Sequence, residues 1–262
     1  MSFSVQSKAC CTRPPIVLRG GYEYQEKGKF EDFNGMKTYV TGSATATRGI
    51  FLCYDVFGLF VQAIKGADIL ASDYEQMPDS AGDFKVFMPD FWGDHPQDLA
   101  NFPPKTPVQR KAIMKFFEEQ GDPSKTVPLI EPLLQAFQEK NPQITSWATL
   151  GFCWGVKITS LVTTKGTKFK AAAGAHPSLM DVEDAKQIVV PTCILPSQDE
   201  DPDLVDAWFA NLKKASPDSY LETFPDQVHG WMTSRADFND LHAFEEYLRG
   251  YRIIRTFFAA HL

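Results

Sequence analysis

The 262-residue chain lacks the features that mark membrane, secreted or nucleic-acid-binding proteins. No window approaches the run of about 18 apolar residues that a transmembrane helix needs, and the opening sequence MSFSVQSKACCTRPP has no apolar core of a secretion signal. Acidic residues outnumber basic ones by 33 to 26, and lysine and arginine form no dense run, so phosphate backbones and anionic membranes should attract the chain weakly. We therefore expect a cytoplasmic protein whose partners include neither nucleic acid nor membrane.

Cysteine is also sparse. Five cysteines in a chain of this length make an odd set that does not suggest a disulfide framework. Cys10 and Cys11 are adjacent, without the spacing of zinc ligands, and are expected to be surface thiols. Cys53 and Cys193 stand inside apolar runs, where cysteine serves as a small buried hydrophobe. Only Cys153 occupies a turn-like sequence.

Apolar runs of strand length alternate with segments of helical periodicity along nearly the whole chain. This alternation predicts an α/β fold, with a mostly parallel central sheet and helices on both faces. No long polar linker interrupts it, so we predict a single domain at 21–262, preceded by a loosely held N-terminal arm at 1–20. The expected strands are 48–54, 84–88, 145–150, 169–174, 191–195 and 219–224, and the expected helices are 60–72, 107–120, 126–140, 155–165, 203–215 and 236–259.

The sequence GFCWG at 151–155 has the Gly-x-Cys-x-Gly outline of a nucleophile elbow. An elbow needs glycine two positions either side of the nucleophile, because the strand turns into the helix so sharply that side chains there would collide. An expected strand enters this turn and an expected helix leaves it, as the motif requires. Taken alone, the pattern fits equally well a tight turn around a buried cysteine.

An attacking cysteine needs two partners. A thiol with a pKa of about 8.5 is mostly protonated at neutral pH, so Cys153 would require a histidine to accept its proton and an acid to orient that histidine. Asp199 and His229 each follow an expected strand, and the order nucleophile, acid, histidine is that of the α/β-hydrolase fold. Asp201 is the alternative acid, but the proline after it favours an extended conformation there.

Other candidates lie on loops after strands, where ligands bind in such sheets. The backbone N–H groups of Val56 and Trp154 are the expected oxyanion-hole donors. Trp92 and Trp231 could wall an apolar acyl pocket, or merely cover the core. His176 also ends a strand, and we expect it to be structural.

Together these residues resemble the dienelactone hydrolase family of the α/β-hydrolase superfamily, and most closely its fungal branch. The resemblance runs from about residue 30 to the C-terminus and is carried by YDVFG, ADILA, VFMPDFWG, GFCWG, AHPS, the Asp199 loop and HGW. It implies a triad of Cys153, His229 and Asp199 that hydrolyses a small ester or lactone through an acyl-cysteine. It also implies that neither a metal nor a cofactor takes part, and that the partner is a small-molecule substrate.

Three positions depart from the bacterial members of that family. Where those proteins carry a glutamate that contacts the thiol, this chain has Asp55, which is one methylene shorter and is the candidate modulator of the thiol. Where they carry two arginines for the substrate carboxylate, it has Asp94 and Thr233. An acidic residue would repel an anionic substrate. Arg235 is either a substitute for those arginines or a lone surface residue.

Two functions of other classes remain open at this stage. The chain could bind a ligand with weak turnover, because the three departures alter residues that the resemblance assigns to substrate recognition. It could also act as a thiol redox sensor built on Cys10 and Cys11. The oligomeric state does not follow from the sequence.

Overall fold

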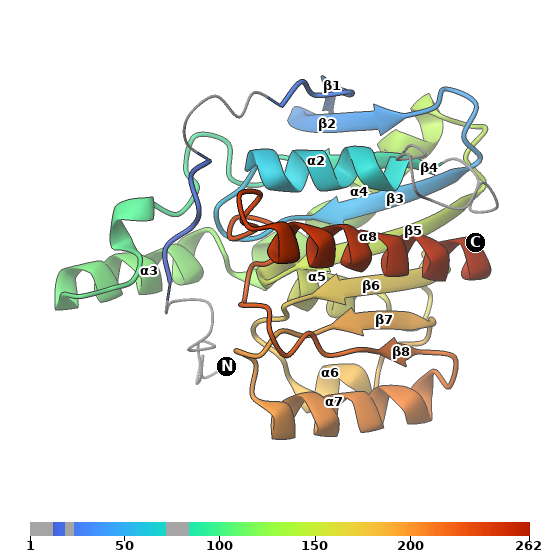
Figure 1. The fold of residues 1–262 in the computed structure, drawn as a ribbon. Helices are drawn as coiled ribbons and strands as arrows, with labels where there is room; N and C mark the ends of the chain where they lie inside the picture. Colours follow the sequence, from blue (N-terminus) through green and yellow to red (C-terminus); the bar gives the residue numbers. More distant parts are fainter. Residues whose placement is uncertain (1–12, 19–23, 72–83) are drawn as a thin grey trace.

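The computed structural model describes residues 13–18, 24–71 and 84–262. Eight strands of this part form one sheet in the order β1-β2-β4-β3-β5-β6-β7-β8 (Figure 1). Neighbours from β4 to β8 are parallel, whereas β2 is antiparallel to both β1 and β4, so the predicted mostly parallel sheet is confirmed. The strands are β1 (Lys29–Phe33), β2 (Met36–Gly42), β3 (Arg48–Cys53), β4 (Phe84–Pro89), β5 (Ser146–Phe152), β6 (Ala171–Ala175), β7 (Thr192–Leu195) and β8 (Tyr220–Leu221).

Helices cover both faces of this sheet, as the alternating pattern predicts (Figure 1). Helices α2 (Val61–Ala71) and α8 (Leu241–His261) contact one face. On the other face lie α4 (Pro123–Lys140) and α5 (Trp154–Val162), with α6 (Val182–Ala185) and α7 (Pro202–Ala215) beside α5. The 3₁₀ turn η2 (Leu99–Asn101) and helix α3 (Pro107–Glu119) extend past the carboxyl ends of the strands (Figure 1). Among the residues described, no helix has the length and apolarity to span a bilayer.

The hairpin of β1 and β2 is missing from the strands that periodicity predicts. Its turn is Asn34-Gly35, and both residues have positive φ, 55° and 80°. An Asn-Gly pair is the strongest short-range signal of such a turn. The prediction failed because the exposed face of β1 makes its apolar pattern weak, while the turn signal was present in the sequence.

The central strands are buried on both sides, which explains their continuous apolar runs. Every residue of β6, AAAGA, is buried, and so are the last residues of β3 and β5. Cys53 and Cys193 lie in this core, as predicted, and burial raises the pKa of both thiols far above the usual range. Burial thus disfavours the thiolate form of both residues.

Residues 13–18, part of the expected N-terminal arm, make contacts with the domain. Pro15 is buried, and the Ile16 N–H donates to the Ser234 carbonyl at 2.8 Å. Hydrogen bonds from a distant loop attach the segment to the domain, a contact that local sequence cannot reveal. The rest of the predicted arm, including Cys10 and Cys11, lies mostly outside the described residues.

Candidate active site

The turn between β5 and α5 places Cys153 in a strained backbone conformation. Its φ of 53° and ψ of −113° lie in a region that non-glycine residues rarely adopt. Such a conformation costs roughly 1–3 kcal/mol and persists only where the surrounding structure enforces it, most often at functional sites. This is the backbone geometry of a nucleophile elbow.

The two glycines that flank Cys153 are required by close backbone approaches. A Cβ added to Gly151 would lie 2.2 Å from the Gly155 carbonyl oxygen, and one added to Gly155 would lie 2.2 Å from the Cys53 carbonyl oxygen. The turn is also held from β6, because the Cys153 N–H donates to the Ala175 carbonyl at 3.2 Å. The steric reason for the Gly-x-Cys-x-Gly pattern is thus confirmed.

His229 lies beside Cys153, and both side chains are buried, with relative exposures of 1% and 2%. Burial acts to lower the pKa of His229. The charge and hydrogen bond of a thiolate at Cys153, together with the Glu200 carboxylate, outweigh this effect and raise the pKa. The surroundings therefore favour the protonated form of His229.

The acid that contacts the histidine ring is Glu200, so the prediction of Asp199 is corrected. Glu200 Oε1 lies 2.6 Å from His229 Nδ1, and its side chain is 3% exposed. Asp199 Oδ2 instead accepts a hydrogen bond from the His229 backbone N–H at 2.9 Å. Asp201, the other candidate, caps α7 by accepting from the Asp203 N–H at 3.1 Å.

A tight turn after β7 decides between these acids. The Asp199 N–H donates to Ser197 Oγ at 3.2 Å, and the Ser197 N–H donates to the Glu200 carboxylate. The turn directs the Glu200 side chain inward beneath His229. Sequence reasoning missed Glu200 because it assigned the acid to the first carboxylate after the strand, and the loop offers several.

The two expected oxyanion-hole donors lie on neighbouring turns. Strands β3 and β5 are paired with Cys53 opposite Gly151, so the turns that carry Val56 and Trp154 begin side by side. Trp154 is the first residue of α5, where the backbone N–H has no acceptor within the helix. Both amides therefore lie at the same edge of the sheet as Cys153, as a shared oxyanion site requires.

Asp55 is buried close to Cys153, and its carboxylate is fully engaged. It accepts hydrogen bonds from Thr233 Oγ1 at 2.6 Å, Ser234 Oγ at 2.7 Å and the Phe57 N–H at 2.9 Å. Burial raises the pKa of Asp55, and the negative charge of Cys153 raises it further. Thr233 holds the position at which the family resemblance predicts a substrate-binding arginine. Its hydroxyl instead binds Asp55 and so connects the loop after His229 to the turn after β3.

The two tryptophans proposed for the pocket have different surroundings. The ring of Trp92 lies 4.5 Å from that of Trp154, and its Nε1 donates to the Asp55 carbonyl at 3.0 Å. Trp92 therefore borders the oxyanion turns. Trp231 stacks on Phe224 at 4.2 Å and lies against Gly250 of α8, where an added Cβ would lie 2.5 Å from its ring. These contacts support the alternative expectation, that Trp231 covers the core.

Arg235 is neither a surface residue nor placed to receive a carboxylate. It is 4% exposed, and its guanidinium donates to the backbone carbonyls of His229 and Arg13. The proposed capture of a substrate carboxylate is therefore corrected. Asp94, in contrast, is exposed on the loop after β4.

His176 is a member of this cluster that the sequence analysis left as structural. Its ring centroid lies 5.1 Å from that of His229, and it stacks on Phe152 at 5.6 Å. Burial lowers its pKa well below the usual range, and the nearby charges of His229 and Arg235 add to this effect. A neutral imidazole thus packs against His229. Its position at the end of β6, the strand next to β5, is the sequence feature that indicates a place near Cys153.

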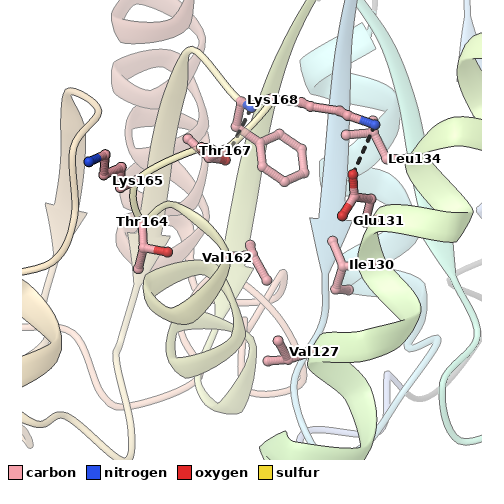
Figure 2. A pocket seen from close by; sticks show the side chains of 11 residues that line it. Val127, Ile130, Glu131, Leu134, Val162, Thr164, Lys165, Thr167 and Lys168 are labelled. Atoms are coloured by element: carbon pink, nitrogen blue, oxygen red, sulfur yellow. Dashed lines mark hydrogen bonds and ion pairs between the residues drawn. The ribbon is translucent and has the colours of Figure 1, made fainter.

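A separate pocket of about 240 Å³ lies between α4 and the segment after α5 (Figure 2). Its apolar wall includes Val127, Ile130 and Val162, and an ion pair of 3.0 Å joins Lys168 to Glu131 at its edge (Figure 2). None of the residues that line it belongs to the cluster around Cys153. This pocket is therefore distinct from the candidate active site.

The sheet, the strained turn and the chain order of Cys153, Glu200 and His229 define an α/β-hydrolase fold. The crystal structure of a dienelactone hydrolase from Anabaena variabilis superposes with a TM-score of 0.62 at 10% identity, covering 91% of this chain and 98% of that one. The structure of an esterase from Pyrococcus furiosus gives a TM-score of 0.58 at 11% identity over 94% of this chain and 98% of that one.

The sequence comparisons identify the family. The model of the dienelactone hydrolase family matches residues 36–258, so the chain belongs to this family. An uncharacterized AIM2 family protein of Schizosaccharomyces pombe is 35% identical over 254 residues, covering 95% of this chain and 98% of that protein. A carboxymethylenebutenolidase homolog of Xenopus tropicalis is 24% identical over 225 residues, covering 83% and 84% of the two chains.

Proposed function

We propose that this protein hydrolyses small carboxylic esters or lactones with Cys153 as the nucleophile. The observation that carries the proposal is the arrangement at the elbow: a strained Cys153 lies beside His229, and Glu200 lies 2.6 Å from His229 Nδ1. Family membership supports hydrolysis, and the relatives named for carboxymethylenebutenolidase and dienelactone hydrolase support ester or lactone chemistry.

In the acylation step, the Cys153 thiolate attacks the carbonyl carbon of the substrate. The carbonyl oxygen gains negative charge, which the Val56 and Trp154 N–H groups stabilise. The ester C–O bond then breaks, and the His229 imidazolium gives its proton to the leaving alkoxide. The products are an acyl-cysteine and an alcohol, or a ring-opened acyl chain from a lactone.

Deacylation reverses these roles. Neutral His229 removes a proton from water while the oxygen attacks the thioester carbon, and the C–S bond breaks to release the carboxylic acid and the thiolate. Glu200 stabilises the imidazolium that forms and keeps the ring in the required orientation. Asp199 contributes by holding the backbone N–H of the same histidine.

The burial of both reacting side chains bears on the substrate. His229 and Cys153 have relative exposures of 1% and 2%, so substrate reaches them only when neighbouring side chains move. The carboxylates of Asp55 and Glu200 are also buried in this cluster. A small, neutral acyl group fits this environment better than an anionic one.

Burst kinetics with an activated aryl ester test the proposal. We expect a burst of aryl alcohol equal to the enzyme concentration, and intact-mass spectrometry of the quenched reaction should show one acyl group on Cys153. The burst and the adduct should both be absent from Cys153→Ala. An ester that binds without turnover or adduct would instead support a ligand-binding role and contradict hydrolysis.

The redox-sensor alternative concerns Cys10 and Cys11, which lie outside the described residues. Mass spectrometry after mild peroxide treatment checks it directly, because a sensor would lose both thiols to a disulfide. We expect both thiols to remain reduced.

A further inference from the structure

The backbone of His229 is held by two side chains, independently of the contact between Glu200 and its ring. Its N–H donates to Asp199 at 2.9 Å, and its carbonyl accepts from Arg235 Nη1 at 2.9 Å. The proton transfers proposed for His229 involve its ring, not these backbone groups. A residue that fixes this peptide also decides where the ring lies relative to Cys153.

Arg235 reaches the histidine by folding back across its own turn. Gly230 has a φ of 91°, and a Cβ added there would lie 3.2–3.3 Å from the methylene carbons of Arg235. The guanidinium carbon lies 5.9 Å from the centroid of the Phe57 ring. Gly230 therefore permits both the turn and the close passage of the arginine side chain, which is 4% exposed.

The other side of the guanidinium faces the N-terminal segment. Nε and Nη2 donate to the same oxygen, the Arg13 carbonyl, at 3.1 and 2.6 Å. The guanidinium group is planar and rigid. When Nε and Nη2 both bind the Arg13 carbonyl on one edge, Nη1 points in a fixed direction toward a second acceptor. Arg13 therefore supplies the carbonyl that sets the direction in which the guanidinium reaches His229.

Two further hydrogen bonds hold the segment in place. The Ile16 N–H donates to the Ser234 carbonyl at 2.8 Å, and Gln62 Nε2 of α2 donates to the Ile16 carbonyl at 2.8 Å. Figure 1 shows this stretch running past the carboxyl ends of the strands. It precedes the region that the family model matches, residues 36–258.

We propose that Arg235 is a positioning residue for His229 and that residues 13–16 complete this arrangement, so that the N-terminal segment is a working part of the active site. This inference rests on the proposed function. A buried guanidinium that loses its carbonyl acceptor turns toward another one. The His229 carbonyl is then released, and a displacement of about 1 Å in a reacting group costs on the order of a hundredfold in rate.

The test uses full-length variants and a neutral aryl ester. Arg235→Ala should lower kcat about tenfold or more with little change in KM, because the lost contact orients a catalytic group and touches no substrate. Millimolar guanidinium chloride should restore part of the activity, while sodium chloride at equal ionic strength should not. The matched control is Arg110→Ala, an exposed arginine that donates to the Pro104 carbonyl and should retain wild-type kcat.

The contribution of the N-terminal segment is tested separately. Ile16→Pro removes the N–H that bonds Ser234 and should lower kcat severalfold, whereas Ile16→Ala keeps that N–H and should lose less. Wild-type kcat in Ile16→Pro would overturn the role of the segment. Wild-type kcat in Arg235→Ala, or its loss without any rescue by guanidinium, would overturn the role of Arg235.

Alkylation of Cys153 by iodoacetamide separates this inference from the proposed function. The reaction needs no substrate, and its rate follows the thiolate that His229 stabilises. In Arg235→Ala the pH midpoint of alkylation should rise, even if the wild type proves to hydrolyse no ester. An unchanged midpoint would contradict the inference. Should Arg235→Ala fail to fold, Arg235→Lys, which keeps the charge but loses the fork, must show the same shift.

Discussion

The nucleophile turn and the acid loop lie at the same edge of the sheet, yet they differ in how strictly residue type determines geometry. At 151–155 the backbone passes within 2.2 Å of where two side chains would begin, so only glycine fits either position. The loop after β7 carries three carboxylates in a row, Asp199, Glu200 and Asp201, and each binds a different group. These groups are the His229 backbone N–H, the His229 ring and the Asp203 N–H, respectively. A steric requirement is visible in a sequence, whereas a choice among equivalent carboxylates is not.

The loop that carries His229, here residues 228–235, makes hydrogen bonds to other parts of the site. Asp55, after β3, accepts hydrogen bonds from Thr233 and Ser234, while Arg235 binds the His229 carbonyl. The two contacts of Asp55 connect residues that are more than 170 positions apart in the chain. The loop of His229 thus contacts both the turn after β3 and the acid loop.

The largest expected effect is at the elbow and its histidine. Cys153→Ala and His229→Ala should each lower kcat for an aryl ester by at least about a thousandfold, because the two residues work as one unit. Cys153→Ser should remain far below the wild type, since a hydroxyl holds its proton more tightly than a thiol. Circular dichroism should show an intact fold in all three. Cys153→Ala with wild-type kcat would end the assignment of the nucleophile.

The acid loop gives the next largest effect. Glu200→Gln should lower kcat on the order of a hundredfold or more, because it removes the charge that stabilises the imidazolium. Asp199→Asn should lose less, since an amide oxygen still accepts from the His229 N–H. Asp201→Asn should keep nearly full activity, because asparagine also caps helices. If Asp199→Asn proved more harmful than Glu200→Gln, the ring contact would not be the functional one.

The pH dependence of Cys153 alkylation also tests whether Glu200 acts on the His229 ring. Because the pKa of His229 is raised, we expect its imidazolium to persist as pH rises through neutrality and to stabilise a thiolate at Cys153. Iodoacetamide should therefore react at a nearly constant rate around pH 7, where an ordinary thiol of pKa about 8.5 speeds up about tenfold per pH unit. Glu200→Gln lowers the pKa of His229, so steep dependence should return in that variant. A steep profile in the wild type would contradict the ion pair.

Substrate charge should have an effect of about tenfold in kcat/KM. We expect kcat/KM for a neutral short-chain aryl ester to exceed kcat/KM for a matched ester that bears a free carboxylate. The reason is that Arg235 donates to the Arg13 carbonyl and Thr233 donates to Asp55, so neither binds a substrate carboxylate. Asp94→Arg should narrow the gap. Preference of the wild type for the anionic ester would show that a cation outside this cluster recognises it.

The smallest effect concerns Asp55. Asp55→Asn removes a negative charge near Cys153, so alkylation by anionic iodoacetate should accelerate by a fewfold relative to neutral iodoacetamide. Thr233→Val, which removes a hydrogen bond but no charge, is the control and should leave that ratio unchanged. An equal change of this ratio in both variants would show that Asp55 affects Cys153 only by holding the loop in place.

The sequence by itself determined the alternation of strands and helices and the glycine-flanked turn at Cys153. Burial on both faces demands continuous apolar strands, and the sharp turn at Cys153 demands glycine at Gly151 and Gly155. Both demands act on residues next to one another in the chain, so they leave a local pattern.

Only the tertiary structure decided that Glu200 contacts the ring, that Trp231 packs in the core and that Arg235 joins the N-terminal segment to His229. Each outcome depends on the direction in which a loop turns and on the partner it meets there. A hydrogen bond across 222 positions, from Arg235 to Arg13, constrains neither residue type nor periodicity at the Arg13 end, because the acceptor is a backbone carbonyl that every residue possesses.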